Sequence, residues 1–475
     1  HRFFVITINN ARIACYISPI ASSAESNVFL CADNDLVVKI YNRPEIWRDA
    51  SLKTIIRKGQ SVMGNYAEYW SQYICWPEEI ITQPSLGVCL PGLRQNLSQF
   101  TQFITPILRG NILQTEGAEI LGTWQGQVSI LTALARSVNR LHNTGLCHSK
   151  LIPENVFANP ITGDMTLIGC DSIVETGSNI LLPTKIQMSD YLAPELVMGM
   201  TTRGVEPPQP TVETDRHSLA VLIYQGLLFQ HPLRGSKLHS PIPYENELLM
   251  LGRNALYVEH PTDPTNRLKT PYLSSRILGE QLQDLFIRAF VDGSRHPSKR
   301  PLAAEWEAAL VRLHDQILPC PNPACEARSF ACLESAGKIR CPWCYTEIKG
   351  PRQIPILTFC RPNIKLNSTY LPDFRLVGWP GRTLHAWHTE LGKLPGPGVE
   401  TATLATLKWE KGQDIPGREV WSLENVAISE MVDITNAYNP VFVPTGGNTE
   451  LREGTRIIFG RGDRARVVEV HMQSL

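Results

Sequence analysis

Alternating apolar and polar positions near the start of the chain predict β-hairpins. Two pairs of short, β-prone runs each flank an Asn- or Asp-rich turn, which is the usual composition of a hairpin connection. The paired runs are 3–8 with 12–17 and 28–30 with 36–41, and the turns are 9–10 and 32–35. The first forty residues are therefore expected to form antiparallel strands.

A different periodicity predicts helices further along the chain. Residues 45–62 have a helical pattern, and residues 127–142 carry apolar side chains at steps of three and four. Gly145 follows this second segment and suits a left-handed helix cap. Residues 219–229 are apolar on nearly every side but too few to span a membrane. We therefore expect this last segment to be a buried helix.

The composition changes again in the last third of the chain. Cysteine and proline dominate from about residue 318, and short β-prone runs alternate with Gly, Pro and Asn from about residue 354. This pattern predicts an all-β domain at the end. The expected boundaries are 1–92 for a β-rich part, 93–317 for a helical part, 318–352 for a cysteine-rich module and 354–475 for the all-β domain.

Composition and charge narrow the class of protein. A chain of 475 residues with 43% apolar and 19% charged residues is long enough for several folded domains. Its 45 basic and 45 acidic residues cancel, which disfavours nonspecific binding to nucleic acid or membranes. The first residues lack the features of a signal peptide. We expect a cytoplasmic protein.

The twelve cysteines fall into two groups. Seven are scattered singly among apolar neighbours, as buried reduced thiols are. Four of the others form two short pairs, Cys320 with Cys325 and Cys341 with Cys344. Four thiolates at this spacing suit a closed tetrahedral zinc site, so the sequence predicts structural zinc and leaves Cys332 as a spare cysteine.

Six short motifs in the first 300 residues, in the order found in protein kinases, make this chain resemble that family. The motifs are Val37-Val38-Lys39, residues 148–155 (H-S-K-L-I-P-E-N), residues 167–171 (L-I-G-C-D), Ala193-Pro194-Glu195, Asp215 and Arg300-Pro301. The resemblance implies an α+β, bilobal protein-kinase-like fold, with the N-lobe in 1–92 and the C-lobe in 93–317. It also implies that Lys39 grips nucleotide phosphates, that Asp215 braces the catalytic loop and that Arg300 pairs with Glu195.

A narrower resemblance rests on three further stretches. Trp76-Pro77, residues 231–235 (H-P-L-R-G) and residues 300–306 before the cysteine cluster are similar to bacterial stand-alone kinases with a C-terminal zinc ribbon. Within that group the chain resembles the kinase component of the tellurite-resistance-linked (TerY-P) phosphorylation triad. This resemblance implies two partners, a PP2C-type phosphatase and a von Willebrand A-domain protein.

The catalytic positions depart from the kinase pattern. Lys150 replaces the Asp that accepts the substrate proton, and a charged lysine cannot act as a base unless its pKa is strongly depressed. Loss of a general base costs on the order of 10²–10⁴ in rate. Gly169 replaces the metal-binding Asp, while Asp171 lies two residues on and the second metal ligand, Asn155, is retained. Lys150 either holds a phosphate or pairs with a neighbouring acid.

The nucleotide-binding positions are altered as well. Ala21, Ser23 and Ser26 occupy the places of the three glycines that let a kinase backbone approach phosphate. The hydroxyls of Ser22, Ser23 and Ser26 remain as possible phosphate donors. The usual helix Glu partner of Lys39 is missing, since Asp49 is the only acid between residues 45 and 68.

The final domain carries a weaker resemblance. Residues 421–425 and 451–460 resemble the second half of forkhead-associated sandwiches, which bind phosphothreonine. Arg382 and Asn425 are the phosphopeptide-binding candidates. The alternative is a β-sandwich that binds proteins without recognising a phosphopeptide, because a fold does not fix a function.

Three functions follow in order of preference. The first is a kinase-like signalling protein with degenerate catalytic motifs, a pseudokinase or scaffold with a partner-binding final domain. The second is an active, atypical Ser/Thr kinase that binds ATP and magnesium through Lys39, Asp171 and Asn155. The third is a zinc-ribbon adaptor for nucleic acid, and the neutral net charge counts against it.

Overall fold

The computed structural model describes the chain in two compact units. It covers residues 1–475 except 33–34, 118, 177–185, 203–207, 271–272, 334–337, 364, 366–368, 413–416 and the side chain of Asp463. The first unit comprises residues 1–122, 126–276 and 280–307, and the second comprises 123–125, 277–279 and 308–475. Residues 1–92 lie in the first unit, and residues 93–317 are divided between the two units.

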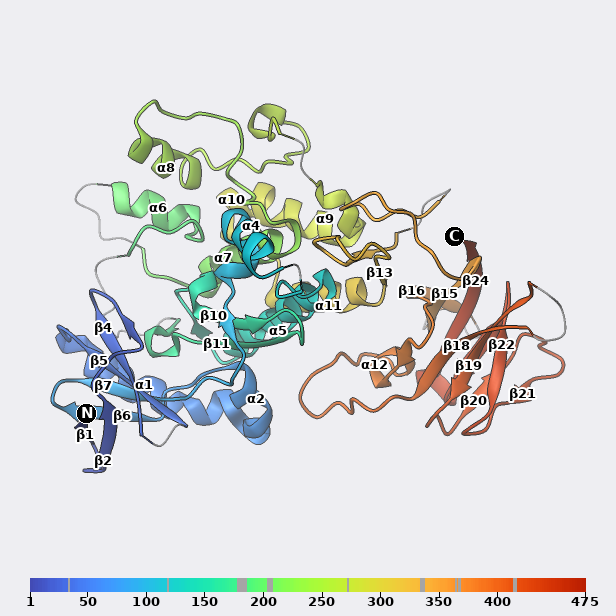
Figure 1. Cartoon of the computed structure of the whole chain (residues 1–475), viewed down its shortest axis with the longest axis horizontal. Coiled ribbons are helices and arrows are strands. Elements are labelled where there is room, and N and C mark those ends of the chain that lie inside the picture. The colour runs from blue at the N-terminus through green and yellow to red at the C-terminus, as the bar shows by residue number, and fades with distance from the viewer. Residues whose placement is uncertain are drawn as a thin grey trace. The chain divides into compact units, whose positions relative to one another are not determined.

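A seven-stranded antiparallel sheet forms the first part of unit 1 (Figure 1). Its order is β2-β1-β6-β7-β5-β4-β3. The strands are β1 (Arg2–Thr7), β2 (Arg12–Tyr16), β3 (Ala21–Ser22), β4 (Ser26–Leu30), β5 (Leu36–Tyr41), β6 (Glu79–Gln83) and β7 (Gly87–Pro91). Both predicted hairpins are confirmed, because β1 pairs with β2 and β4 pairs with β5.

The first hairpin brings two distant parts of the sheet together. β1 lies beside β6, and β2 meets the end of β4 through an antiparallel bridge between Cys15 and Cys31. A hydrogen bond of 2.8 Å from the Ala32 N–H to the Ala14 carbonyl lies next to this bridge. The sheet therefore curls back on itself around a core that includes Val5, Val38 and Ile81.

Helix α1 (Ile46–Met63) follows β5, as the pattern over 45–62 predicted, and precedes the shorter α2 (Ala67–Tyr73). Trp76 packs against the middle of α1. A side-chain carbon added at Gly59 would lie 2.7 Å from the Trp76 indole nitrogen, which donates a 3.2 Å hydrogen bond to the Ile55 carbonyl. Glycine in mid-helix costs about 1 kcal/mol, and here it makes room for a large buried ring.

Helices dominate the second part of unit 1. They are α3 (Thr101–Ile104), α4 (Pro106–Thr115), α5 (Trp124–Asn143, whose first two residues belong to unit 2), α6 (Pro194–Thr201), α7 (Val212–Leu228), α8 (Pro243–Leu251), α9 (Glu280–Ile287), α10 (Gly293–Arg295) and α11 (Ala303–His314, which continues into unit 2). Short strands lie between them: β8 (Ser98–Gln99), β9 (Leu146–Cys147), β10 (Val156–Asn159), β11 (Asp164–Leu167) and β12 (Val174–Glu175).

The predictions for two of these helices are confirmed. Helix α5 covers the amphipathic segment 127–142, and Gly145 adopts the left-handed conformation with φ of +75°. Helix α7 is buried around most of its circumference, and Phe229 caps it with φ of +57°.

Unit 2 contains the cysteine-rich module and the β-rich final region. The module has β13 (Ile317–Pro319) paired with β14 (Ser329–Ala331). Two antiparallel sheets follow, with orders β16-β15-β24-β23-β20-β21 and β17-β18-β19-β22. Their elements are β15 (Gln353–Pro362), β16 (Tyr370–Val377), β17 (Thr383–Leu384), α12 (Ala386–Thr389), β18 (Ala405–Lys411), β19 (Glu419–Asn425), β20 (Met431–Asp433), β21 (Val441–Phe442), β22 (Asn448–Leu451), β23 (Arg456–Phe459) and β24 (Arg466–Ser474).

The strands predicted for the all-β domain over 354–475 are present as two antiparallel sheets, but the short helix α12 departs from an all-β composition. Among the described residues, no helix is both long enough and apolar enough to cross a membrane.

A buried ion pair fastens the helices of unit 1 together. Arg300 lies before α11, is fully buried and donates two hydrogen bonds of 2.8 Å to the Glu195 carboxylate on α6. It also donates to the carbonyls of Glu213 on α7 and Gly293 on α10. Arg300 therefore connects three helices that are distant in sequence.

We expect Arg300→Met to weaken this junction severely. Removing one partner of a buried ion pair costs about 3–5 kcal/mol of stability, because the remaining charge is left buried without an opposite charge beside it. Hydrogen exchange should show that the free energy needed to open α6 and α7 falls by about 3 kcal/mol. The loss is at the lower end of the range because Glu195 is 26% exposed, so water can solvate its charge once Arg300 is gone. The matched control is Arg288→Met, whose pair with Glu305 is exposed and should contribute less than about 1 kcal/mol. Equal effects of the two variants would contradict this role.

Candidate functional site

The candidate site lies where the sheet of unit 1 meets its helical part, around the carboxylate of Asp171. Lys39 on β5 donates a 2.7 Å hydrogen bond to Oδ2 of Asp171, and the Tyr41 hydroxyl donates a second one of 2.6 Å to the same oxygen. Lys39 and Tyr41 are two residues apart on one strand, so both side chains leave the same face. These three residues form what we call the Asp171 cluster.

Charge and burial set the protonation states of the Asp171 cluster. Burial of Asp171 acts to raise its pKa, but the charge of Lys39 and the hydrogen bonds from Lys39 and Tyr41 outweigh it and lower the pKa to about 2. Burial first, and then the neighbouring Asp171 charge, raises the pKa of Tyr41 well above its ordinary value. At neutral pH the cluster thus holds a charged carboxylate, paired with Lys39, and a neutral phenol.

The helix next to Lys39 offers it no acid. The buried face of α1 consists of uncharged side chains, namely Ser51, Leu52, Ile55, Gly59 and Val62. Asp49, the acid noted in the sequence, is exposed and pairs with Lys53 at 2.6 Å. Lys39 therefore has Asp171 as its carboxylate partner in place of a helix glutamate.

Asp215 holds the backbone of residues 148–149, in the stretch that resembles the kinase catalytic loop. This buried α7 carboxylate accepts hydrogen bonds from the N–H groups of His148, at 2.6 Å, and Ser149, at 3.0 Å. The His148 ring donates in turn to the Ile168 carbonyl at 2.8 Å. Residues 148–149 are thus tied both to α7 and to the strand end before Asp171, as the resemblance implied for Asp215.

The backbone conformation at position 169 and its contact with Asn155 both favour glycine there. Its backbone is left-handed, with φ of +83°, and a side-chain carbon built there would lie 3.0 Å from Nδ2 of Asn155. The Asn155 amide donates to the Lys150 carbonyl at 2.9 Å. Asn155 therefore sits directly against the position that lacks a metal ligand, while the nearby carboxylate of Asp171 is engaged by Lys39.

Lys150 extends toward the sheet. Its ammonium lies 3.5 Å from the Glu25 carboxylate, in the turn between β3 and β4, and both side chains are partly exposed. A pair of this kind contributes less than about 1 kcal/mol to stability. Gln187 donates to the other Glu25 oxygen at 3.4 Å. The turn between β3 and β4 thus contacts Lys150 and also Gln187, which lies in the segment before Ala193-Pro194-Glu195.

The turn that aligns with the kinase phosphate loop is closed by its own side chain. The Ser23 hydroxyl accepts hydrogen bonds from the N–H groups of Glu25, at 3.2 Å, and Ser26, at 3.1 Å. The Ser23 N–H donates to the Ser26 carbonyl at 2.9 Å. Ser22 lies exposed on β3, and Ser26 is buried. Three backbone donors of the turn are thus used within it and do not point to a phosphate.

The four predicted metal ligands converge in unit 2. All four sulfur atoms of Cys320, Cys325, Cys341 and Cys344 lie within 4.8 Å of one another. Two sulfur–sulfur distances are 3.5 Å and 3.8 Å, close to the edge of about 3.8 Å expected for a tetrahedron with Zn–S bonds of about 2.3 Å. Cys332 is buried and lies outside this group. The donor set fits a metal ion that prefers four thiolates.

The two phosphopeptide candidates occupy structural positions. The partly buried Arg382 donates hydrogen bonds to the carbonyls of Asp315, Val377 and Ile317. Asn425 is fully buried, donates to the carbonyls of Ile428 and Val443, and accepts from the Ile428 N–H. Both side chains thus hold backbone segments of unit 2, and the structure does not bring them together on an exposed surface.

Sequence analysis named most residues of the site but missed two. Tyr41 follows Lys39 by two positions, and this spacing on a strand was a signal that both would face the same neighbour. Glu25 lies in a turn 125 positions before its partner Lys150, and no local pattern indicates that contact. The structure unites Lys39 with Asp171 and Asn155 with Gly169, but directs Lys150 away to Glu25.

Comparisons with known proteins found matches only among solved structures. No protein-family model matches the chain, and no curated protein does. One similar solved structure is the kinase domain of a Toxoplasma gondii-specific rhoptry antigen. It is 13% identical in sequence, with a TM-score of 0.42, and the match covers 65% of this chain and 85% of that one. A rhoptry kinase of the same organism is 12% identical, with the same TM-score and coverages of 65% and 82%.

A third solved structure, ROP2 from Toxoplasma gondii, is described as a virulence factor with a protein-kinase fold and no enzymatic activity. It is 13% identical, with a TM-score of 0.42 and coverages of 65% and 82%. The first unit of the present chain contains the contacts that the kinase resemblance implied. These are the sheet followed by α1, the loop braced by Asp215, and the pair of Glu195 with Arg300.

The depressed pKa of Asp171 predicts a pH-dependent contribution to stability. Because its folded pKa of about 2 lies below the ordinary value of 3.8, the contribution is complete above the ordinary value and is lost as pH falls through the folded one. We expect the free energy of unfolding to lose about 1 kcal/mol from this group between pH 5 and pH 3.

The test compares urea unfolding of the wild type and of Asp171→Asn across this pH range. The variant should lack the Asp171 component, so the difference between the two proteins should shrink by about 1 kcal/mol as the pH falls. Asp49→Asn is the matched control, because the exposed pair of Asp49 with Lys53 should leave the wild-type pH profile unchanged. A pH-independent difference would mean that Asp171 is not held ionised by Lys39.

Proposed function

We propose that this chain is a pseudokinase: a kinase-like signalling protein that does not transfer phosphate efficiently and acts through binding. The observation that carries this proposal is the Asp171 cluster. Lys39 and Asp171 are the two groups that would bind the nucleotide phosphates and the metal, and here they neutralise each other at 2.7 Å. A nucleotide would have to break a buried ion pair before either group became available.

The surrounding loops support the same proposal. Phosphoryl transfer depends on positioning and charge neutralisation, with backbone donors of the phosphate loop and a base for the attacking hydroxyl. Here the donors of the turn are satisfied by Ser23, and the position of the base holds Lys150, which faces Glu25. The fold of the lobe is retained by Asp215 and Arg300, whose contacts stabilise helices and do not require catalysis.

An active, atypical Ser/Thr kinase is the second candidate, and one observation favours it. Asp171 remains ionised two residues after Gly169, and Gly169 packs against the Asn155 that aligns with a metal ligand, so a carboxylate and an amide oxygen are offered to magnesium from adjacent segments. In that case ATP with magnesium would displace Lys39 from Asp171, and Lys39 would contact phosphate. The two candidates differ in whether Asp171 is needed for a measurable reaction.

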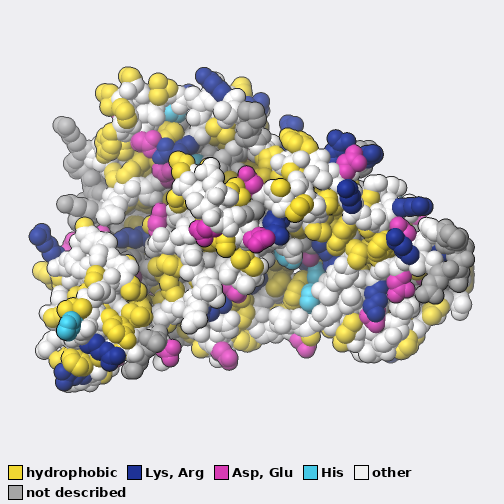
Figure 2. Space-filling model, in the orientation of Figure 1, with side chains coloured by type: hydrophobic (Ala, Val, Ile, Leu, Met, Phe, Trp, Pro, Cys, Tyr) yellow, Lys and Arg dark blue, Asp and Glu magenta, His cyan; other side chains and the backbone are white. Residues whose placement is uncertain are grey.

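We assign the binding role to the second unit, and we assign structural zinc to its four-cysteine site. The proposed partners are the PP2C-type phosphatase and the von Willebrand A-domain protein that the triad resemblance implied. A forkhead-associated-like fold for the final region remains part of this proposal, without Arg382 and Asn425 as its phosphate ligands. Nucleic acid is a weaker candidate for the partner of this chain. Binding it would favour a continuous basic patch, whereas the described Lys and Arg side chains on the face in Figure 2 are interspersed with acids.

We expect no phosphoryl transfer above background with magnesium and radiolabelled ATP. Wild type and Lys39→Ala should incorporate the same trace of phosphate, because the base and one metal ligand are missing and the reaction is slowed by on the order of 10²–10⁴ for the base alone. Lys53→Ala, on the exposed face of α1, is the matched control. Transfer by wild type and Lys53→Ala that both Lys39→Ala and Asp171→Asn abolish would establish the active kinase instead.

We expect one zinc ion per chain, bound by the four cysteines. Cys344→Ser should lose the metal and destabilise the module, because the binding free energy of structural zinc is also folding free energy. Cys332→Ser should keep the full metal content, since its sulfur lies outside the cluster. Elemental analysis of freshly purified proteins makes the comparison. Equal zinc content in the two variants, or none in the wild type, would refute the assignment.

A further inference from the structure

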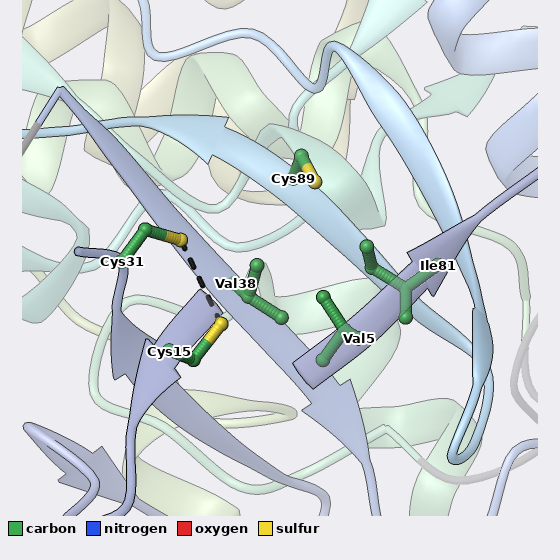
Figure 3. Close-up of a cluster of buried hydrophobic side chains, with 6 residues drawn as sticks. All are labelled: Val5, Cys15, Cys31, Val38, Ile81 and Cys89. Carbon is green, nitrogen blue, oxygen red and sulfur yellow. Dashed lines mark hydrogen bonds between the residues drawn. The ribbon is translucent and has the colours of Figure 1, made fainter. Parts of the chain in front are cut away.

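Two buried cysteines face each other where β2 meets the end of β4 in the sheet of unit 1, a junction that we call the seam. Cys15 lies on β2 and Cys31 directly follows β4, and together they form the antiparallel bridge between these strands. Their sulfur atoms are 3.8 Å apart (Figure 3). Both side chains are fully buried in the core that also contains Val5, Val38 and Cys89. The sequence placed these cysteines among scattered thiols, and only the fold makes them neighbours.

The backbone geometry of this pair suits a disulfide. The Ala32 N–H donates to the Ala14 carbonyl, so the hydrogen bond joins the residues flanking the cysteines and not the cysteines themselves. In such a non-hydrogen-bonded antiparallel pair the Cα atoms are about 4.5 Å apart and the side chains are closest. Disulfides need Cα separations of about 4.4–6.8 Å. The two sulfurs can therefore bond without a rearrangement of the strands.

We propose that Cys15 and Cys31 form a reversible disulfide when the protein meets a peroxide. One thiolate attacks a peroxide oxygen, which yields a sulfenic acid and releases water after proton transfer. The second thiolate then attacks that sulfur and displaces hydroxide, which takes up the released proton. In total, two thiols and one hydrogen peroxide give one disulfide and two waters, so the two sulfurs lose the two electrons that the peroxide gains.

The disulfide changes how the first hairpin is held. In the reduced protein, the antiparallel bridge at Cys15 and Cys31, with its hydrogen bond from the Ala32 N–H to the Ala14 carbonyl, joins β2 to the end of β4. A covalent bond at the same place prevents the hairpin from separating from β4. Because both sulfurs are fully buried, oxidation requires brief opening of this seam. The oxidation state therefore fixes whether the sheet can open at β2, whatever the catalytic activity of the protein.

Peptide mapping of the full chain tests the proposal directly. Residues 13–39 form one tryptic peptide that contains Cys15 and Cys31 and no other cysteine, because Lys or Arg first recurs at Lys39. The protein is treated with hydrogen peroxide, unfolded in iodoacetamide and digested. We expect this peptide to lose both alkylation sites and to be two hydrogens lighter than the unmodified dithiol form. Treatment with dithiothreitol before alkylation should restore both sites.

Two variants provide controls for the pairing. Cys89→Ser removes the third buried thiol of the same core and should leave the loss of both alkylation sites unchanged. Cys31→Ser should leave Cys15 without its disulfide partner. A wild-type peptide that stays fully alkylated while partly exposed methionines are oxidised would overturn the proposal, and so would a disulfide that joins Cys15 to Cys89. Because both outcomes are measured in wild-type protein, they do not depend on whether a variant folds.

Discussion

The buried negative charge of Asp171 organises the centre of the first unit. The Asp171 carboxylate is 1% exposed, and a buried charge is tolerated only when it is paired and hydrogen-bonded. Lys39 and Tyr41 supply both conditions from one strand of the sheet. The same pairing joins the sheet to the helical part and engages the two groups to which the kinase resemblance assigns phosphate and metal. One interaction thus holds the fold together and is also the basis of the proposal that the chain does not transfer phosphate efficiently.

The other departures from the kinase pattern are consistent with this pair. Gly169 adopts a left-handed conformation that strains other residues, and an added side-chain carbon would press tightly on the Asn155 amide. The turn closed by Ser23 has no need to hold a phosphate, and its Glu25 provides a counter-charge for Lys150. In contrast, the contacts of Asp215 and Arg300 are retained in full.

Cysteine has two different roles in the two units. In unit 2, four sulfurs converge in a geometry that suits a metal, and tight turns at each pair present them together. In unit 1, Cys15 and Cys31 are packed as apolar side chains within a sheet core, and they meet because the sheet curls until β2 reaches the end of β4. The first arrangement needs metal to neutralise adjacent thiolates, whereas the second is stable as two neutral thiols that oxidation can join.

Local patterns determined much of this protein from sequence alone. The hairpins, the amphipathic α5, the buried α7 and the β-rich final region follow from periodicity, and the four-cysteine site follows from short spacings, because each depends on residues close in sequence. Only the tertiary structure decided that Lys39 pairs with Asp171, that Lys150 faces Glu25, that Cys15 meets Cys31 and that Arg382 and Asn425 are structural. These contacts join strands and loops far apart in the chain, and the burial that selects each partner arises only when the whole sheet and its helices have packed.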